Sequence, residues 1–434
     1  MKSEGSDTAA VLVGMPEFVV LSAVEEDGEV WLLVETRTSV TACPSCGVRA
    51  KAKDRRETMV RDLPVAGRPT VLMWRKRRWR CPDADCTTKT WSESSEQIGP
   101  RAVLTHRARR EICRRVGEEA RAVAEVARDF GVSWDTAMEA VREHGPPLVD
   151  DPERICHVRD LGIDETSYLA ATPEHPTLWA TGIVDTARGI LVDVIEGRNA
   201  AELRRWLEAM GTEWLAGVAT VSIDPHEAYR NGLHPPLDHA TVVADPFHIT
   251  RLANRAVDDV RRRTQHEETG HRGRRGDPLY DIRKLLITGQ ERLGERAWDK
   301  LTDALGRGDP RDEVLASWLA KEHLREAYAT DDPDEAAVIL DAVIEECEGA
   351  TIKELARLAK TLRRWRTEIL NHHRTGRSNG PTEAMNLLIK AVKRVGRGFT
   401  NFDNYRLRLL LHCGVEWDTY RTASMRGRRP RFAA

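Results

Sequence analysis

The first segment with a regular pattern of hydrophobic and polar positions covers residues 17–40, in the run FVVLSAVEEDGEVWLLVETRTS. Alternation of apolar and polar residues is typical of strands with one buried face. Asp27-Gly28 interrupts the run near its middle, and this pair favours a tight turn. A second strand-like stretch, VRDLPVAGRPTVLMWRKRRWRC, is centred on Gly67. The pattern predicts a β-hairpin followed by further short strands.

The apolar spacing becomes helical between Leu104 and His144. Apolar residues recur there at intervals of three and four: Ile112, Val116, Ala120, Val123, Val126 and Ala127. The run AVAEVARDFGVSWDTAMEAVREHG predicts two helices joined by a tight turn at residues 131–133, with Ser133 capping the second helix. This is a helix-turn-helix pattern, which ordinary helical hairpins share. If the second helix enters the major groove, its candidate DNA contacts are Trp134, Asp135, Thr136, Glu139 and Arg142.

Residues 145–152, which include Gly145-Pro146-Pro147, mark a boundary, and strand-like patterns return after it. The predicted order is a strand ending at 161–165, strands at 178–184 and 190–195, a helix, a strand ending in Asp224, a short helix at 227–231 and a strand before Asp245. This order is that of an RNase H-like fold, a mixed sheet flanked by helices. Residues 250–376 are helical almost throughout, and a new helix is expected around Pro381.

We therefore predict a multidomain α+β protein. Its expected segments are N-terminal strands with a zinc-ribbon-like finger (1–100), a helix-turn-helix region (101–150), the first part of an RNase H-like catalytic core (151–250), an all-helical insertion (251–376), and the final part of the core with a C-terminal tail (377–434).

Composition limits the location of the protein. A length of 434 residues is enough for two to four domains, and 31% charged residues with a mean hydropathy of −0.50 indicate a soluble chain. No apolar run approaches the roughly 20 residues of a membrane span, and the N-terminus lacks the features of a secretory signal. We expect a cytoplasmic protein that associates with the nucleoid when it is bound to DNA.

The net charge of −2 hides an uneven distribution. Residues 49–80 contain twelve Lys/Arg and three Asp/Glu, whereas residues 331–352 contain eight acidic residues and no basic ones. The basic segment could contact phosphates, and its candidate DNA-binding residues are Arg75, Lys76, Arg77 and Arg78. The interleaved Trp74, Trp79 and Trp91 could stack on DNA or pack under the finger. The acidic segment is expected to be a solvated surface.

Four of the eight cysteines are clustered as two pairs, Cys43 with Cys46 and Cys81 with Cys86. Two such pairs can supply the four soft ligands of a tetrahedral structural Zn²⁺ site. The alternative is four unrelated reduced thiols. The other four cysteines are scattered and are expected to be small buried hydrophobic residues: Cys113, Cys156, Cys347 and Cys413.

Three carboxylates suit metal-dependent phosphoryl transfer. Asp164 is expected at the end of a central strand and Asp224 at the end of a neighbouring strand, and Glu383 lies in the first turn of a later helix. Two divalent ions held by such carboxylates can activate the attacking oxygen and stabilise the leaving one, and oxygen ligands select Mg²⁺ or Mn²⁺. A single Asp at a strand end is more often a cap or turn residue, so the combination carries the hypothesis.

Nearly the whole chain resembles the ISL-three family of insertion-sequence transposases, which are bacterial DDE enzymes. The resemblance rests on the cysteine pairs, the helix-turn-helix, GIDE at 162–165, SIDPHEAYR at 222–230, ADPFHITRLAN at 244–254, SNGPTEAMN at 378–386 and KRVGRGFTNFDNYRLR at 393–408. It implies an RNase H-like core with a DDE triad, DNA cleavage at the element ends by water, and joining by the freed 3′-hydroxyl.

By this resemblance the first catalytic Asp is Asp164 and the final Glu is Glu383. The second catalytic Asp is either Asp224, because the fourth strand of such a core normally carries it, or Asp245, because it lies in the ADPFH motif one strand later. We favour Asp224, with Asp245 and His248 as positioning residues. Glu165 is a weaker candidate, because adjacent strand positions point to opposite faces.

Residues around Glu383 suit supporting roles. Asn379 and Asn386 could orient its carboxylate or contact DNA. Lys390, Lys393, Arg394 and Arg397 are candidate phosphate contacts, with a solvated basic helix as the alternative.

The expected partners are double-stranded DNA, comprising the terminal inverted repeats and the target, and further copies of the chain, in at least a dimer that synapses two ends. The competing functions are a DNA-binding regulator derived from a transposase without catalysis, and a nuclease or resolvase that cuts but does not join.

Overall fold

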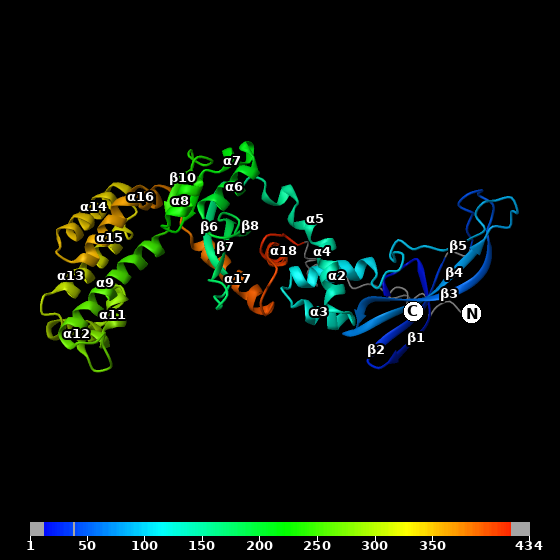
Figure 1. Cartoon of the computed structure of the whole chain (residues 1–434), viewed down its shortest axis with the longest axis horizontal. Helices are drawn as coiled ribbons and strands as arrows, with labels where there is room; N and C mark the ends of the chain where they lie inside the picture. Colours follow the sequence, from blue (N-terminus) through cyan, green and yellow to red (C-terminus); the bar gives the residue numbers. More distant parts are fainter. Residues whose placement is uncertain (1–12, 38–39, 418–434) are drawn as a thin grey trace, which may run out of the picture. The chain divides into compact units, whose positions relative to one another are not determined.

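The computed structural model describes residues 13–37 and 40–417 (Figure 1). The chain forms two compact units, one made of residues up to Arg154 together with those from Lys390 onward, and the other made of residues from Ile155 to Ile389. The last predicted segment, 377–434, therefore contributes to both units. No helix in the described ranges is both long and apolar enough to cross a membrane.

The first unit contains a five-stranded sheet. Its strands are β1 (Phe18–Glu26), β2 (Glu29–Thr36), β3 (Lys51–Val65), β4 (Arg68–Arg80) and β5 (Thr90–Ser92), and the order is β1-β2-β4-β3 with β5 paired to β4. The predicted hairpin is confirmed, since β1 and β2 are antiparallel and the turn has positive φ at Asp27 (50°) and Gly28 (77°). The prediction of short strands around Gly67 is wrong, because β3 and β4 have 15 and 13 residues.

Buried tryptophans pack against this sheet. Trp74 is buried and meets the ring of Phe18 edge to face, with the centroids 5.6 Å apart. Trp79 is also buried, and Trp91 is half-buried. Trp74 and Trp79 therefore pack under the sheet and are not available to stack on DNA.

The helices of the first unit confirm the predicted helix-turn-helix. They are α2 (His106–Gly117), α3 (Val123–Phe130), α4 (Trp134–His144), α5 (Pro146–Val149) and, from the far end of the chain, α18 (Phe402–Cys413). Gly131 ends α3 with φ 65°, and Ser133 Oγ caps α4 by accepting from the Thr136 N–H at 3.2 Å. Ala120, expected on a helix face, lies in the loop before α3. Helix α18 packs against α2, where His412 Nδ1 lies 3.0 Å from the Gly117 carbonyl oxygen.

The second unit is built on a mixed sheet. Its strands are β6 (Asp160–Leu169), β7 (Leu178–Asp185), β8 (Ile190–Glu196), β9 (Thr220–Ile223) and β10 (Thr241–Ala244), in the order β10-β9-β6-β7-β8. Strands β6, β7 and β8 are antiparallel neighbours, whereas β9 and β10 run parallel to β6. The helices between β8 and β10 are α6 (Ala200–Met210), α7 (Thr212–Gly217) and α8 (Glu227–Leu233).

The predicted order of these elements is confirmed, but the predicted end of the first strand is wrong. Strand β6 continues past Glu165 to Leu169 because it stays paired with β7 over this length. Asp164 therefore lies in the middle of a strand and not at its end.

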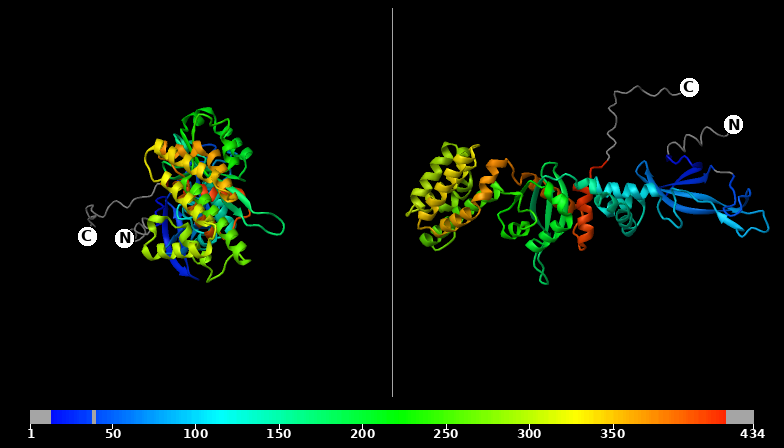
Figure 2. Two further views of the ribbon diagram at one scale, coloured as in Figure 1. Left: turned by 90° about the vertical axis from the view of Figure 1, so that its left-hand side faces the viewer. Right: turned by 90° about the horizontal axis from the view of Figure 1, so that it is seen from above.

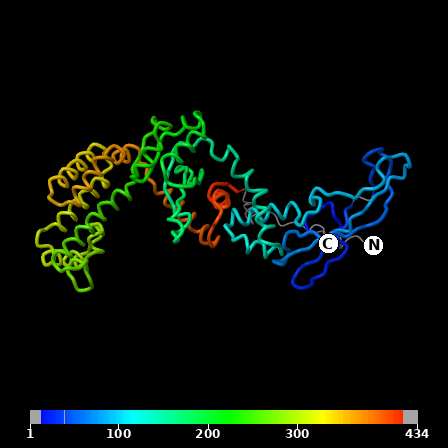
Figure 3. The backbone as a smooth tube through the Cα atoms, in the orientation of Figure 1, coloured from blue at the N-terminus to red at the C-terminus, as the bar shows by residue number. Residues whose placement is uncertain are grey.

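A long helical segment follows β10 and returns to it (Figures 2 and 3). It contains α9 (Pro246–Thr269), α10 (Pro278–Asp281), α11 (Arg283–Ile287), α12 (Glu295–Gly308), α13 (Glu313–Ala327), α14 (Pro333–Gly349), α15 (Lys353–Arg364) and α16 (Arg366–Thr375), with a short 3-10 turn at Gln290–Arg292. Helix α16 packs on β10, where Asn371 Nδ2 donates to the Val242 carbonyl at 2.8 Å. The chain thus leaves and rejoins the sheet at the same edge. Helix α17 (Gly380–Val395) then begins beside β6.

Gly162 in β6 permits the start of α17 to approach the sheet. A Cβ atom at this position would collide with the Thr382 hydroxyl and lie 2.9 Å from Asn379 Oδ1. Asn379 Nδ2 also donates to the Ile163 carbonyl at 3.4 Å. The absence of a side chain at Gly162 is therefore a requirement of this helix–strand contact.

We expect Gly162→Ala to destabilise the second unit by about 1–3 kcal/mol, because the added methyl must displace α17 from β6. Thermal unfolding of the whole chain measures this. The matched control is Gly306→Ala in α12, where a Cβ would meet nothing within 4 Å; it should be neutral or stabilise by up to about 1 kcal/mol. Equal melting temperatures for the two variants would show that the contact is not tight.

Candidate functional site

Two carboxylates on neighbouring parallel strands form the centre of the site. Ile163 of β6 is in register with Ile223 of β9, so Asp164 and Asp224 occupy equivalent positions one residue further along. Ligand oxygens of Asp164, Glu165 and Asp224 all lie within 4.8 Å of one another. Burial, and then the charge of Asp224, raise the pKa of Asp164 to about 7. The pair is crowded and poorly solvated, so its anionic form requires compensating positive charge or hydrogen bonds.

Asn386 provides one of those hydrogen bonds. It is buried on α17, and its Nδ2 donates to Asp164 Oδ2 at 2.6 Å. The other oxygen, Oδ1, accepts from the Glu165 backbone N–H at 2.7 Å. Asn386 lies one helical turn after Glu383. The predicted orienting role of Asn386 is thus directed at Asp164.

Asp245 has a different environment from Asp224. It caps the N-terminus of α9, and its side chain is almost fully buried. Its Oδ2 accepts from the His248 backbone N–H at 3.3 Å, and its Oδ1 accepts from the Asn379 N–H at 3.0 Å. Burial raises the pKa of Asp245, but these hydrogen bonds outweigh it and keep the pKa below its usual value. Both oxygens of Asp245 are therefore engaged in holding α9 and the start of α17.

His248 links the two aspartates. Its Nδ1 lies 2.9 Å from Asp245 Oδ2 and 2.8 Å from Asp224 Oδ1. One N–H is available at this nitrogen, so it donates to Asp245 and leaves Asp224 Oδ1 in ionic contact alone. Burial lowers the pKa of His248, but the two carboxylates dominate and raise it to about 9. The imidazolium therefore balances part of the negative charge.

Glu383 lies in the first turn of α17 and is half-buried. Burial and then the charges of Asp245 and Asp224 raise its pKa, with His248 opposing them. Its carboxylate is thus within the electrostatic field of the aspartates. Among the described residues, two groups of possible metal ligands are close together here. One group is Asp164, Glu165 and Asp224, and the other is Asp224, Asp245 and His248. Glu383 belongs to neither group.

Glu165 is held by a residue that the sequence pattern did not single out. The Tyr229 hydroxyl donates to Glu165 Oε2 at 3.0 Å, and Arg198 lies 3.7 Å from Oε1. Tyr229 is fully buried on α8, five residues after Asp224 in the SIDPHEAYR motif. A buried tyrosine in a motif that carries a catalytic candidate is a usable signal, because its hydroxyl needs a polar partner. Glu165 points toward α8, yet its carboxylate still reaches the Asp164 group.

The four clustered cysteines meet at the ends of β3 and β4. The Sγ atoms of Cys43 and Cys86 are 3.7 Å apart, those of Cys46 and Cys81 are 3.5 Å apart, and all four lie within 4.8 Å of one another. A tetrahedral Zn²⁺ with bonds of about 2.3 Å separates its sulfur ligands by about 3.8 Å. The thiols therefore fit a structural zinc ion, and the alternative of four unrelated thiols is wrong. As expected, Cys113, Cys347 and Cys413 are buried elsewhere, but the expectation is wrong for Cys156, which is only half-buried.

The basic residues of β4 are engaged within the protein. Arg77 and Arg75 approach Glu35 at 3.0 and 3.5 Å, and Arg78 pairs with Asp54 at 3.2 Å. Lys76 lies 4.6 Å from the Trp74 ring centroid. The side chain of Arg77 is only 13% exposed. These contacts within the protein stabilise the sheet.

The other DNA-binding candidates are more accessible. At the start of α4, Trp134 is 45% exposed and Thr136 is half-buried. Arg142 is exposed, and its Nε donates to Asn404 Oδ1 of α18 at 3.2 Å. On α17, Lys390 and Arg394 are exposed and Lys393 is half-buried, with its pKa lowered by burial.

Three family models match consecutive parts of the chain. The model for the finger, described as the zinc-finger of transposase IS204/IS1001/IS1096/IS1165, matches residues 39–86. The helix-turn-helix domain of transposase family ISL3 matches residues 93–145. The ISL3 model described as transposase matches residues 161–409, which is 249 of the 434 residues and includes Asp164, Asp224 and Glu383.

Two relatives share this similarity. The transposase for insertion sequence element IS1557 of Mycobacterium tuberculosis is 28% identical over 301 residues, and the match covers 64% of the chain and 64% of that relative. The transposase for insertion sequence element IS1001 of Bordetella parapertussis is 22% identical over 382 residues, or 87% of the chain and 90% of the relative. With the family model covering more than half of its length, the chain belongs to the ISL3 family of transposases, the ISL-three family that its motifs resemble.

Proposed function

We propose that the chain is an active DNA transposase. It cleaves DNA at the ends of its insertion sequence and joins the freed 3′-hydroxyls to a target. The observation that carries this proposal is the crowding of Asp164 and Asp224 on adjacent parallel strands, in a chain that also carries a zinc-ribbon and a helix-turn-helix domain. Three antiparallel strands followed by two parallel ones support an RNase H-like core, and α9–α16 then form a helical insertion before Glu383.

The donor set fits divalent metal ions. Asp164 and Asp224 offer hard oxygen ligands close together, and Glu383 lies in the same electrostatic field. Oxygen ligands favour Mg²⁺ or Mn²⁺ over softer metals. Two such ions, when bound, would activate the attacking oxygen and stabilise the leaving one. We assign Asp164, Asp224 and Glu383 to hold them.

The choice of Asp224 as the second carboxylate follows from the hydrogen bonds of its rival. Asp245 accepts three N–H groups, two at Oδ2 and one at Oδ1, whereas Asp164 accepts two, so Asp245 has less capacity left for a cation. Asp224 belongs to both groups of possible ligands and has one oxygen in ionic contact only. Asp245 and His248 then hold Asp224 in place, and Asn386 orients Asp164.

The substrate is double-stranded DNA, comprising the terminal inverted repeats of the element and the target. Helix α4 would read the major groove with Trp134, Thr136 and Arg142. Lys390, Lys393 and Arg394 would contact phosphates from the helix that carries Glu383. Because two ends must be brought together before joining, we propose that the active form is at least a dimer.

We expect Asp224→Asn to lower cleavage and strand transfer by about a thousandfold, equivalent to about 4 kcal/mol of transition-state stabilisation. Asp245→Asn should cost only about ten- to a hundredfold, because it acts through another side chain. The assay is cleavage and joining of a duplex with the element ends in Mg²⁺. If Asp245→Asn abolishes chemistry while Asp224→Asn does not, the assignment of Asp224 is wrong. A regulator would instead bind the duplex and cleave nothing, with or without either substitution.

We expect Asn386→Ala to reduce activity by about ten- to a hundredfold and to raise the Mg²⁺ concentration needed for half-maximal rate, because Asp164 loses the hydrogen bond that orients it. Measuring the rate over a Mg²⁺ series checks both effects. Asn231→Ala is the control, since this asparagine is exposed near the end of α8. A reduced rate with an unchanged Mg²⁺ requirement would contradict the orienting role.

We expect Cys46→Ser to remove the bound zinc and to lower the unfolding temperature of the first unit, because the thiol cluster provides all four ligands. Metal analysis should find about one Zn²⁺ per chain in the wild type and much less in the variant. Cys156→Ser, outside the cluster, should keep the full zinc content. Wild-type protein that holds no zinc and whose melting is insensitive to chelators would overturn the assignment.

A further inference from the structure

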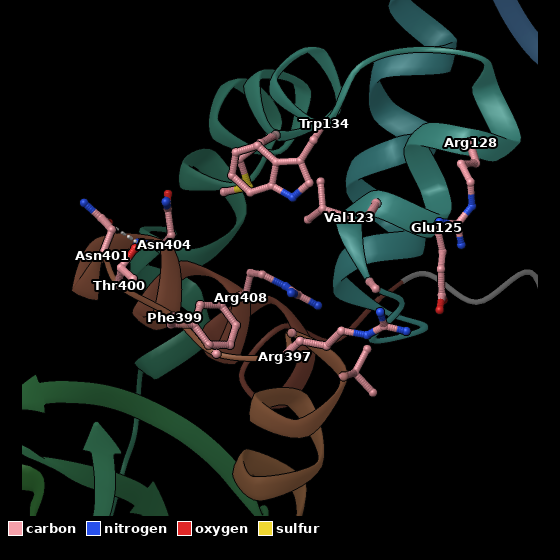
Figure 4. A pocket seen from close by; sticks show the side chains of 16 residues that line it. Val123, Glu125, Arg128, Trp134, Arg397, Phe399, Thr400, Asn401, Asn404 and Arg408 are labelled. Atoms are coloured by element: carbon pink, nitrogen blue, oxygen red, sulfur yellow. Dashed lines mark hydrogen bonds between the residues drawn. The ribbon is translucent and has the colours of Figure 1, made fainter. Parts of the chain in front are cut away.

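A pocket lies within the first unit, between the helix-turn-helix and the segment that follows α17 (Figure 4). It encloses about 190 Å³, which is room for a phosphate group with bound water, given about 30 Å³ per water molecule. One wall is the start of α3 with Trp134 and Met138 of α4, and the other is residues 395–401 with Asn404 and Arg408 of α18. The second wall comes from the C-terminal motif that the catalytic assignment leaves without a role.

Arg408 is the unusual group in this pocket. Its side chain is 3% exposed, and its planar guanidinium lies over Phe399, 5.4 Å from the ring centroid. One nitrogen donates to the Arg121 carbonyl at 3.0 Å, while Nε has no hydrogen-bond partner. No described carboxylate forms an ion pair with it, and burial lowers its pKa to about 10. A buried, unpaired guanidinium is costly unless an anion accompanies it.

The surroundings are also suited to an anion. Helix α3 starts at the pocket, and its N-cap residue Ala122 makes no side-chain capping bond, so the first backbone N–H groups are open to a ligand. Figure 4 shows Arg397 and Arg408 both directed from the C-terminal segment toward Val123 at this helix start. Arg128 adds a third guanidinium to the lining against one carboxylate, Glu125.

We propose that this pocket binds a backbone phosphate of the DNA that the helix-turn-helix reads. Arg408 and the N-terminus of α3 would donate hydrogen bonds to the phosphate oxygens, and Arg397 would close over them. The position beside Trp134, the first residue of the recognition helix, favours a DNA phosphate over a free ion, since phosphate contacts set the register of such a helix on the duplex. This inference rests on the proposed DNA-binding function. It assigns residues 396–401, which form part of the second wall, to phosphate binding.

The test measures binding of the full chain to a duplex from one end of the element over a series of salt concentrations. Arg397→Gln, an exposed position, should weaken binding about tenfold and reduce the slope of log affinity against log salt by about 1. Arg408→Gln should do the same or more. Arg307→Gln, on α12 in the second unit, removes an equal charge and should leave both quantities unchanged.

Each outcome decides the proposal. If Arg408 is only structural, Arg408→Gln will lower the unfolding temperature while Arg397→Gln binds like the wild type with an unchanged slope, and the proposal falls. Calorimetric titration with inorganic phosphate is the second arm: phosphate binding by the wild type with no loss of DNA affinity in either variant would assign the pocket to a free anion and also overturn it. Wild-type protein that binds DNA through this pocket but cleaves none would refute the catalytic function and leave the inference intact.

Discussion

The repulsion between Asp164 and Asp224 is the constraint around which the second unit is organised. Parallel pairing of β6 with β9 forces these carboxylates together, and burial keeps water from screening them. The protein compensates with an imidazolium from α9 and an amide from α17. Each compensating group comes from a helix that begins beside the sheet, so the positions of both helices depend on the same pair of charges.

This dependence explains why a long helical segment can stand between two parts of one site. Asp245 caps α9 at the start of the segment and accepts the Asn379 N–H just after its end. One buried carboxylate thus joins the exit and the re-entry of the chain. Residues of α9, α13, α14 and α15 pack together, and their apolar core is continuous with that of the sheet.

The first unit holds the recognition helix α4 in a fixed position. A thiol cluster holds the far ends of β3 and β4, and buried tryptophans fill the sheet. The helix-turn-helix is completed by α18, which follows the second unit in the sequence but packs against α2. Arg142 of α4 bonds to Asn404 of α18, so a segment that follows the second unit in the sequence contacts the recognition helix.

Local physics let the sequence determine much of this protein. The hairpin turn at Asp27-Gly28 and the Ser133 cap depend on near neighbours along the chain. The order of strands and helices along the second unit and the two cysteine pairs are likewise visible in the sequence. The extent of β6 was misjudged because it depends on pairing with β7 and not on its own alternation. The burial of Trp74 and Trp79 likewise depends on what covers the sheet.

Only the tertiary structure shows which groups distant in sequence surround one another. The sequence left Asp224 and Asp245 as rivals, because both follow short strands; only their partners, His248 and the Asn379 N–H, distinguish an engaged cap from an available carboxylate. The unpaired state of Arg408 was invisible for the same reason. Hydrogen bonds and desolvation are set by atoms brought together across hundreds of residues, and a linear pattern records only which residues are present.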